Sequence, residues 1–199
     1  MKKDFVYLAS ASPRRSELLR QIGVPFEVRP TAIAEDQLAR ETPEAYVARL
    51  AAAKAETIWA AAAGDSRPVL AADTAVVLDG DVLGKPETEA EAATMLERLS
   101  GRTHRVLTAV ALRHAGGLET RLSQSEVRFR ATTAAERLAY CRTGEPFDKA
   151  GGYGIQGHAA VFVEEIKGSY SGVVGLPLFE TAALLSRCGI DFWHTTRAA

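Results

Sequence analysis

The order of apolar and polar residues along the chain predicts short buried strands separated by amphipathic helices. Residues 5–9 form a short apolar run, which predicts a buried strand. Ser12 and Pro13 follow as an N-cap and a first helical residue, and Gly23 marks the end of that helix. A second short strand is predicted at 26–28.

A polar, irregular segment at 30–41 leads to a second helix, which begins at Thr42-Pro43 and is predicted to run to about Ala63. Its apolar stripe consists of Val47, Leu50, Lys54 and Ile58. A lysine on such a stripe has two interpretations. Its ammonium group can extend past the core into water, or it can point into a functional site at the edge of the core. The spacing alone leaves both open.

The centre of the chain predicts a buried strand followed by a hairpin. Residues 69–74 are apolar up to Asp73, so this strand is expected to end in a carboxylate. The hairpin is predicted over 75–83, with Asp79-Gly80 as a type I′ turn. A carboxylate between two apolar runs is difficult to place on the surface, which favours a functional role for Asp73.

The second half of the chain continues to alternate between helices and strands. Capping-box signals at Thr88–Glu91 and Thr133–Glu136 predict two helix starts. The other predicted elements are strands at 104–113 and 118–129 joined at Gly116-Gly117, a strand at 161–166, a turn at 168–172 and a last helix from Pro177 to Gly189.

These elements predict a single α/β (α+β) domain over residues 1–199. Because helices are mixed with hairpins and strict β-α-β alternation is missing, we expect a mixed, largely antiparallel central sheet flanked by helices. The tail, about residues 193–199, is expected to be frayed.

Composition and charge exclude several classes of partner. Of the 199 residues, 47% are apolar and 25% are charged, with 24 Lys and Arg against 25 Asp and Glu. This balance gives no bulk attraction to nucleic acid or to an anionic membrane, and no signal or membrane-spanning run is found. Cys141 and Cys188 have no metal-like spacing and are expected to be core residues on helices. We therefore expect a cytoplasmic protein without nucleic-acid or membrane partners.

The stretch LASASPRRSELL, residues 8–19, predicts an anion site. A helix N-terminus exposes unpaired N–H groups and the positive end of the helix dipole, so positive side chains there repel it unless an anion is present. Ser10 and Ser12 add hydroxyl groups, and Arg14 adds a fork that matches phosphate oxygens. Arg15 has two interpretations, as a further ligand of the anion or as a surface residue.

Two acidic residues and two lysines extend this hypothesis to phosphoryl chemistry. Glu35, in the irregular segment, and Asp73 are candidates to hold Mg²⁺ or Mn²⁺ or to activate water. Lys54 and Lys85 could converge with Arg14 on a triphosphate. Such a site needs charges in the right positions and little covalent chemistry.

The glycine-rich segment GEPFDKAGGYGIQG, residues 144–157, is a candidate for base recognition. Gln156 offers a donor and an acceptor on one amide, which could pair with the carbonyl and imide N–H of uracil or thymine. The amide could also turn to suit cytosine. The four histidines, His104, His114, His158 and His194, show no metal-ligand spacing and are expected to be structural or surface residues.

Taken in order, these motifs resemble the Maf family of nucleotide pyrophosphatases. The resemblance is carried by LASASPRRSELL at 8–19, RLAAAKA at 49–55, LAADTAVVLDGDVLGKP at 70–86, LSGRTHRVLTAV at 99–110, EPFDKAGGYGIQG at 145–157 and GSYSGVVGLPL at 168–178. The DKAGGYGIQG form resembles the branch acting on dTTP and UTP rather than the branch that favours 7-methyl-GTP. The chain differs from many members at Ala11 and Ala71, where they have glycine, and at His158.

The resemblance implies cleavage between the α and β phosphates with a divalent cation, Mg²⁺ or Mn²⁺, in a deep cleft of a fold similar to inosine-triphosphate pyrophosphatases. It implies these roles: Asp73 as proton acceptor, Arg14, Thr74 and Gln156 as specificity residues, Ser10, Arg14, Lys54 and Lys85 as phosphate ligands, and Glu35 and Asp73 as metal ligands. A homodimer is plausible by analogy.

Two other functions remain open at this point. One is a nucleotide sensor that influences cell division through a partner, since the family has been linked to septum inhibition. The other is a hydrolase that removes purine analogues such as ITP from the nucleotide pool.

Overall fold

The computed structural model describes residues 5–62 and 64–193. Seven strands and six α-helices are found in this part of the chain. The strands are β1 (Val6–Leu8), β2 (Phe26–Val28), β3 (Val69–Leu78), β4 (Asp81–Leu83), β5 (Thr103–His114), β6 (Gly117–Phe129) and β7 (Val163–Lys167). The α-helices are α1 (Pro13–Gln21), α2 (Pro43–Ala61), α3 (Glu89–Leu99), α4 (Ala134–Cys141), α5 (Tyr170–Val174) and α6 (Leu178–Arg187). Three short 3₁₀ helices, η1 (Glu145–Asp148), η2 (Ala150–Gly152) and η3 (His158–Phe162), complete the elements of this part.

The strands form a mixed sheet in the order β2-β1-β3-β5-β6-β7, with β4 paired to β3. β1 runs parallel to β2 and to β3, with Tyr7 opposite Glu27 and Val69. β4 is antiparallel to β3, and β7 is antiparallel to β6. The predicted mixed α/β architecture is therefore confirmed.

The course of β3 corrects one prediction from the sequence. Asp73 lies in the middle of this ten-residue strand, not at its end. The prediction was wrong because β3 is buried along almost its whole length, so the run that was divided at Asp73 continues as one strand. In β6 the residues alternate instead, with Ser123, Ser125, Val127 and Phe129 buried.

Local signals placed most helix starts correctly. Ser12 and Thr42 are N-cap residues with proline following, and the Thr42 hydroxyl accepts from Ala45 N at 3.2 Å. Thr133 and Glu136 form the predicted capping box. At Thr88 only half of the predicted box is present, because the Glu91 carboxylate accepts from Glu87 N instead.

Three further predictions are corrected by the backbone. The turn predicted at 168–172 contains the start of the short helix α5, whose Gly172 N–H is bonded to the Ser169 hydroxyl. The last strand begins at Val163, because η3 occupies the preceding residues. Cys188 is half-buried just after α6 rather than a core residue, whereas Cys141 is buried as expected. The predicted end of the second helix at Ala63, and the tail beyond Trp193, lie outside the described residues.

The chain divides into two compact units. The first contains residues 1–73, 108–123 and 175–199, and the second contains residues 74–107 and 124–174. Whether they act as the predicted single domain stays a prediction.

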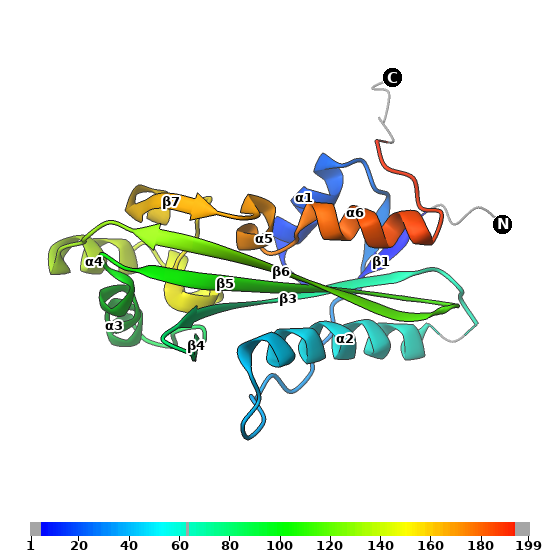
Figure 1. Ribbon diagram of the computed structural model, residues 1–199, viewed down its shortest axis with the longest axis horizontal. Helices are drawn as coiled ribbons and strands as arrows, with labels where there is room; N and C mark the ends of the chain where they lie inside the picture. Colours follow the sequence, from blue (N-terminus) through cyan, green and yellow to red (C-terminus); the bar gives the residue numbers. More distant parts are fainter. Residues whose placement is uncertain (1–4, 63, 194–199) are drawn as a thin grey trace. The chain divides into compact units, whose positions relative to one another are not determined.

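In the first unit, α2 lies on one side of the strands and α1 and α6 lie on the other (Figure 1). Val47, Leu50, Ala51 and Ile58 form the buried face of α2. This arrangement places Lys54, on the same face, against the strands rather than in water.

In the second unit, α3 packs against α4 and η2. An aromatic cluster forms part of its core, and its members are His104, Phe129, Tyr140, Tyr153 and Phe162. His104 Nε2 is 2.8 Å from the Tyr153 hydroxyl. Among the described residues, no helix combines the length and the apolar character needed to cross a membrane.

Candidate functional site

The start of α1 is built as a polar loop on a buried strand end. Ser10 is buried, and its hydroxyl oxygen accepts from Ser12 N at 3.2 Å and from Arg15 Nη1 at 3.1 Å. Arg15 Nε also donates to the carbonyl oxygen of Gly175 at 2.8 Å. Arg15 is therefore not simply a surface residue, because it joins the helix start to a segment 160 residues away in the sequence. Arg14 is half-buried beside it on α1.

Lys54 connects the two candidate acidic residues. Its ammonium nitrogen lies 2.6 Å from Glu35 Oε1 and 2.7 Å from Asp73 Oδ1. The side chains of Lys54 and Asp73 are only 11% and 10% exposed, whereas that of Glu35 is 45% exposed. Of the two interpretations of this lysine, the structure supports the one in which its ammonium group points inward, and it brings Glu35, Lys54 and Asp73 into direct contact.

The surroundings of Asp73 favour a basic carboxylate. Burial raises the pKa of Asp73, although Lys54 and Arg15 act to lower it. Burial also lowers the pKa of Arg15, while Asp73 and Glu35 act to raise it. Asp73 is thus buried next to two positive groups, Lys54 and Arg15, and one other carboxylate, Glu35. Such a carboxylate binds a proton more readily than an exposed one.

The segment between β2 and α2 is held onto α2 by side chains that were not predicted as site residues. The Tyr46 hydroxyl donates to the backbone oxygen of Glu35 at 2.9 Å. Arg49 donates to Asp36 O at 3.0 Å and forms a two-point ion pair with Glu41, at 2.6 and 2.7 Å. These contacts fix the backbone that carries Glu35.

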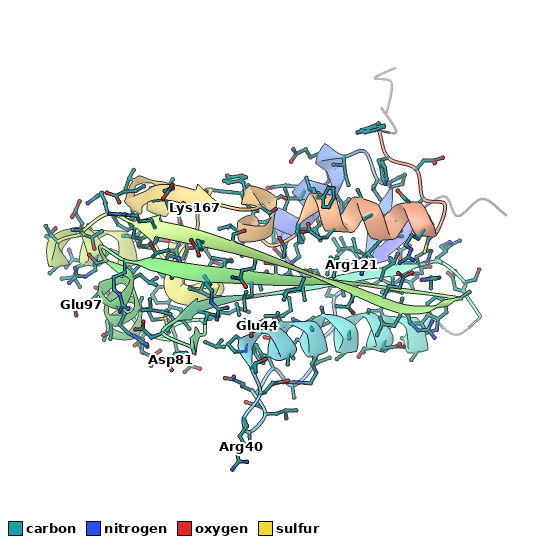
Figure 2. All side chains as sticks on the ribbon, in the orientation of Figure 1. Arg40, Glu44, Asp81, Glu97, Arg121 and Lys167 are labelled. Atoms are coloured by element: carbon teal, nitrogen blue, oxygen red, sulfur yellow. The ribbon has the colours of Figure 1, made fainter. Side chains whose placement is uncertain are left out.

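A sequence signal for one of these residues was present. Tyr46 lies eight residues before Lys54, so it shares a helix face with the lysine. No comparable pattern points to Arg49 or Glu41. Figure 2 shows Arg40 at the tip of the same segment, pointing away from α2.

Glu35 and Asp73 are suited to hold a divalent cation together with phosphate groups. Within the described residues, no group of three or more His, Cys, Asp and Glu side chains is placed to hold a metal ion. Glu35 and Asp73 nevertheless point their oxygens at one nitrogen. Mg²⁺ is commonly bound by one or two carboxylates, with substrate phosphates and water completing its shell. Two converging carboxylates therefore suit Mg²⁺ or Mn²⁺ bound together with a phosphate.

The remaining candidates lie in the second unit. Thr74 follows Asp73 in β3 and is half-buried, and Lys85 is exposed after β4. Gly84 O accepts from Gly151 N at 2.9 Å, so the segment carrying Lys85 is bonded to the glycine-rich segment. Gln156 is exposed in that segment.

The described histidines agree with structural or surface roles. His104 is buried, and its pKa is lowered to about 4 by burial. His114 lies 3.4 Å from Glu119, and His158 lies 2.9 Å from Glu145. His194 lies outside the described residues.

The chain is similar to known proteins over most of its length. The family profile of the Maf-like proteins matches residues 5–188, a span that includes every candidate residue described above. A dTTP/UTP pyrophosphatase of Methylobacillus flagellatus is 52% identical over 185 residues, which cover 93% of each chain. Proteins of the same name from Cupriavidus pinatubonensis and Aromatoleum aromaticum are 52% and 54% identical. These alignments cover 95% and 92% of this chain and 99% and 95% of the relatives.

Proposed function

This chain belongs to the Maf-like protein family, and we propose that it is a pyrophosphatase that hydrolyses dTTP and UTP to the nucleoside monophosphate and pyrophosphate. The observation that carries the proposal is the contact of Lys54 with both Glu35 and Asp73, at 2.6 and 2.7 Å. A buried cation between two carboxylates is an arrangement for handling charged phosphates and for activating water. By acting on the nucleotide pool, the enzyme would keep abnormal nucleotides out of nucleic acid.

Positive groups and helix amides bind the triphosphate in this proposal. The Ser10 oxygen already accepts from two N–H donors, so its hydroxyl hydrogen is suited to a phosphate oxygen. The backbone N–H groups at the start of α1 also donate to the phosphate oxygens in this proposal. Arg14, Lys54 and Lys85 supply the charge that neutralises the phosphates.

Asp73 is the proton acceptor for the attacking water. Its burial raises its pKa, so the carboxylate is a stronger base than an exposed aspartate. Lys54 and Arg15 oppose this shift and favour the ionised carboxylate. The water would attack the α phosphorus, and pyrophosphate would leave.

Glu35 and Asp73 would hold the divalent cation, Mg²⁺ or Mn²⁺, together with the phosphates. When bound, the cation supplies positive charge to the leaving pyrophosphate. Tyr46 and Arg49 hold the Glu35 segment in position for this role.

Gln156 pairs with the base, and Arg14 and Thr74 contribute to substrate choice. The glutamine amide presents a donor and an acceptor, which match the imide N–H and carbonyl of uracil and thymine. We also infer that the protein acts in the cytoplasm, where its nucleotide substrates are found, and as a homodimer.

The test is pyrophosphate release from purified protein with a panel of nucleoside triphosphates and Mg²⁺ or Mn²⁺. We expect dTTP and UTP to be turned over fastest, and Asp73→Asn to lower the rate by about 1,000-fold or more while the protein stays folded. Near-normal turnover by Asp73→Asn would show that another group accepts the proton.

The same panel separates the rival functions. No release from any nucleotide would favour a nucleotide sensor acting in cell division. Faster turnover of ITP or another purine nucleotide would favour a hydrolase for purine analogues.

A further inference from the structure

Gln156 lies in a tight turn whose shape decides where its amide points. Gly157 N donates to Gly154 O at 3.0 Å, so Ile155 and Gln156 are the two central residues of a β-turn. Ile155 is buried and Gln156 is exposed. The turn therefore anchors one central side chain in the core and presents the other to solvent.

One carboxylate, that of Glu145, is linked to both sides of this turn, directly on one side and through the Tyr140 hydroxyl on the other. Its Oε2 accepts from His158 N at 2.9 Å, two residues after Gln156. Its Oε1 accepts from the Tyr140 hydroxyl at 2.9 Å. The Tyr140 oxygen in turn accepts from Gly154 N at 3.2 Å, two residues before Gln156. Glu145 therefore contacts the residue two after Gln156 directly, through both its N–H and its ring, and reaches the residue two before it through Tyr140.

Gly154 and Gly157 pack so closely against the Glu145 and Lys149 side chains that a larger residue at either position would force one of those side chains to move. A Cβ atom on Gly157 would lie 2.2 Å from Glu145 Oε2, and one on Gly154 would lie 2.9 Å from Oε1. The Glu145 side chain is only 14% exposed, and Lys149 Nζ donates to its backbone oxygen at 2.8 Å. Close packing around a buried acceptor makes this turn rigid.

The two bonded groups keep complementary protonation states at neutral pH. Burial acts to raise the pKa of Glu145, but hydrogen bonds from His158 and Tyr140 outweigh it and lower the pKa. Burial and the bond to Glu145 raise the pKa of Tyr140. Glu145 is thus an ionised acceptor and Tyr140 a neutral donor.

The turn presents the Gln156 side chain, which contributes no hydrogen bond to the described part of the fold. Within residues 5–62 and 64–193, the Gln156 amide has no hydrogen-bond partner. A fixed turn holds the exposed amide in one orientation. Accurate recognition of a hydrogen-bond donor and acceptor on a ligand requires such an orientation.

We propose that Glu145 and Tyr140 are positioning residues that orient Gln156 and thereby set the enzyme's preference among nucleobases. This inference rests on the proposed function, because Gln156 is taken to contact the base. Neither residue touches the substrate in this proposal. Both act through the backbone of the turn.

Two variants test the proposal, and a third is the control. Glu145→Gln weakens the bonds to both ends of the turn. Tyr140→Phe removes only the hydroxyl between Gly154 and Glu145. Glu136→Gln is the matched control, because that carboxylate also accepts a backbone N–H, from Thr133 at 2.7 Å, but it lies at the start of α4, where it also pairs with Arg130, rather than at the turn. For each protein, kcat and KM are measured with UTP, dTTP, CTP and GTP, and melting temperature is measured alongside.

For Glu145→Gln we expect KM for UTP and dTTP to rise about 10-fold, with kcat within about twofold of wild type. The preference for UTP over CTP, taken as the ratio of kcat/KM values, should fall by a similar factor. Tyr140→Phe should move the preference the same way by a smaller factor. Glu136→Gln should lower the melting temperature without changing the preference.

An unchanged UTP over CTP preference in both Glu145→Gln and Tyr140→Phe would overturn the inference, as would an equal loss of rate on all four nucleotides. If Glu145→Gln does not fold, Tyr140→Phe decides by the same criterion. Binding of non-hydrolysable UTP and CTP analogues is measured by calorimetry on the same proteins. Absence of wild-type turnover would therefore overturn the proposed function alone, and the binding preference would still test the positioning role.

Discussion

Replacing Lys54 by methionine would leave the Asp73 carboxylate buried without its closest cation. In the wild type the Lys54 nitrogen is 2.7 Å from Asp73 Oδ1, and both side chains are about nine-tenths buried. Methionine has a similar length and an apolar end, so it fills the space along the face of α2 without restoring the charge. The change therefore isolates the electrostatic part of the interaction.

The expected loss of stability follows from the burial of the ion pair between Lys54 and Asp73. Removing one partner of a buried ion pair destabilises a protein by about 3–5 kcal/mol. Arg15 remains close enough to Asp73 to affect its pKa, so the lower end, about 3 kcal/mol, applies here. Losing the ion pair between Lys54 and Glu35 adds little to this loss of stability, because the Glu35 side chain is 45% exposed. For a chain of 199 residues the melting temperature should fall by about 6–12 °C.

The loss should also depend on pH. Lys54 acts to lower the pKa of Asp73, so its removal raises that pKa further above the value in the unfolded chain. A carboxyl group with a raised folded-state pKa destabilises the fold increasingly as pH rises through that range. The difference in stability between Lys54→Met and wild type should therefore be largest at neutral pH and shrink toward about pH 4. For the same reason, the acid limb of the pH-rate profile should move to higher pH.

Urea unfolding at about pH 7.5 and about pH 4.5 measures these differences, with the double substitution Lys54→Met/Asp73→Asn as the companion variant. Because the asparagine side chain carries no charge, the double variant should recover most of the stability lost at neutral pH. This account of the ion pair is refuted if Lys54→Met is as stable as wild type at neutral pH, or if the double variant is no more stable than the single one.

Three further changes test other parts of the structure. Gly157→Ala places a Cβ atom 2.2 Å from Glu145 Oε2 and should cost about 1–3 kcal/mol in thermal unfolding, whereas Gly84→Ala, with no atom within 4 Å of the added carbon, should cost less than about 0.5 kcal/mol. Equal costs for the two would contradict the close packing of the turn. Burial lowers the pKa of His104 to about 4, so wild-type stability should fall as pH decreases from about 6.5 to about 4, and His104→Gln should flatten that dependence in urea titrations. If the stability of His104→Gln depends on pH as in the wild type, a group other than His104 is responsible for the loss of stability at low pH. Thr133→Ala removes a capping box and should lower stability by about 1 kcal/mol and the melting temperature by about 2–4 °C with no change in kcat, as followed by calorimetry and pyrophosphate release. A loss of activity at temperatures where the variant is folded would indicate that the α4 start affects the site.

Local chemistry made much of the fold predictable. Pro13 and Pro43 mark the first residues of α1 and α2, and Asp79-Gly80 forms the turn between β3 and β4. Each of these signals acts over a few neighbouring residues, so no knowledge of distant contacts is needed. The apolar stripe singled out Lys54 as unusual, but the spacing left open whether its ammonium group extends into water or points into a site.

The parts that were not predictable depend on contacts between distant residues. The bond from Arg15 to Gly175 spans 160 residues, so the helix sequence alone left the role of Arg15 open. β3 continues past Asp73, and both of its faces are buried. The pattern of apolar residues alone does not distinguish such a strand from one that ends at Asp73. Arg49 and Glu41 flank the start of α2, and their contact with the segment carrying Glu35 is visible only in three dimensions.

The two units of the chain meet at four places in the sequence, and three of these lie inside strands β3, β5 and β6. Neither unit is therefore encoded by one uninterrupted piece of the gene. Shortening the gene from either end would remove parts of the first unit, and the second unit could be expressed only with residues 108–123 of the first unit inserted in it. Exchanging one unit for that of a relative would require four simultaneous junctions, three of them within hydrogen-bonded ladders. We therefore expect this protein to be inherited and engineered as a whole chain, with single-residue changes as the practical route to altered specificity.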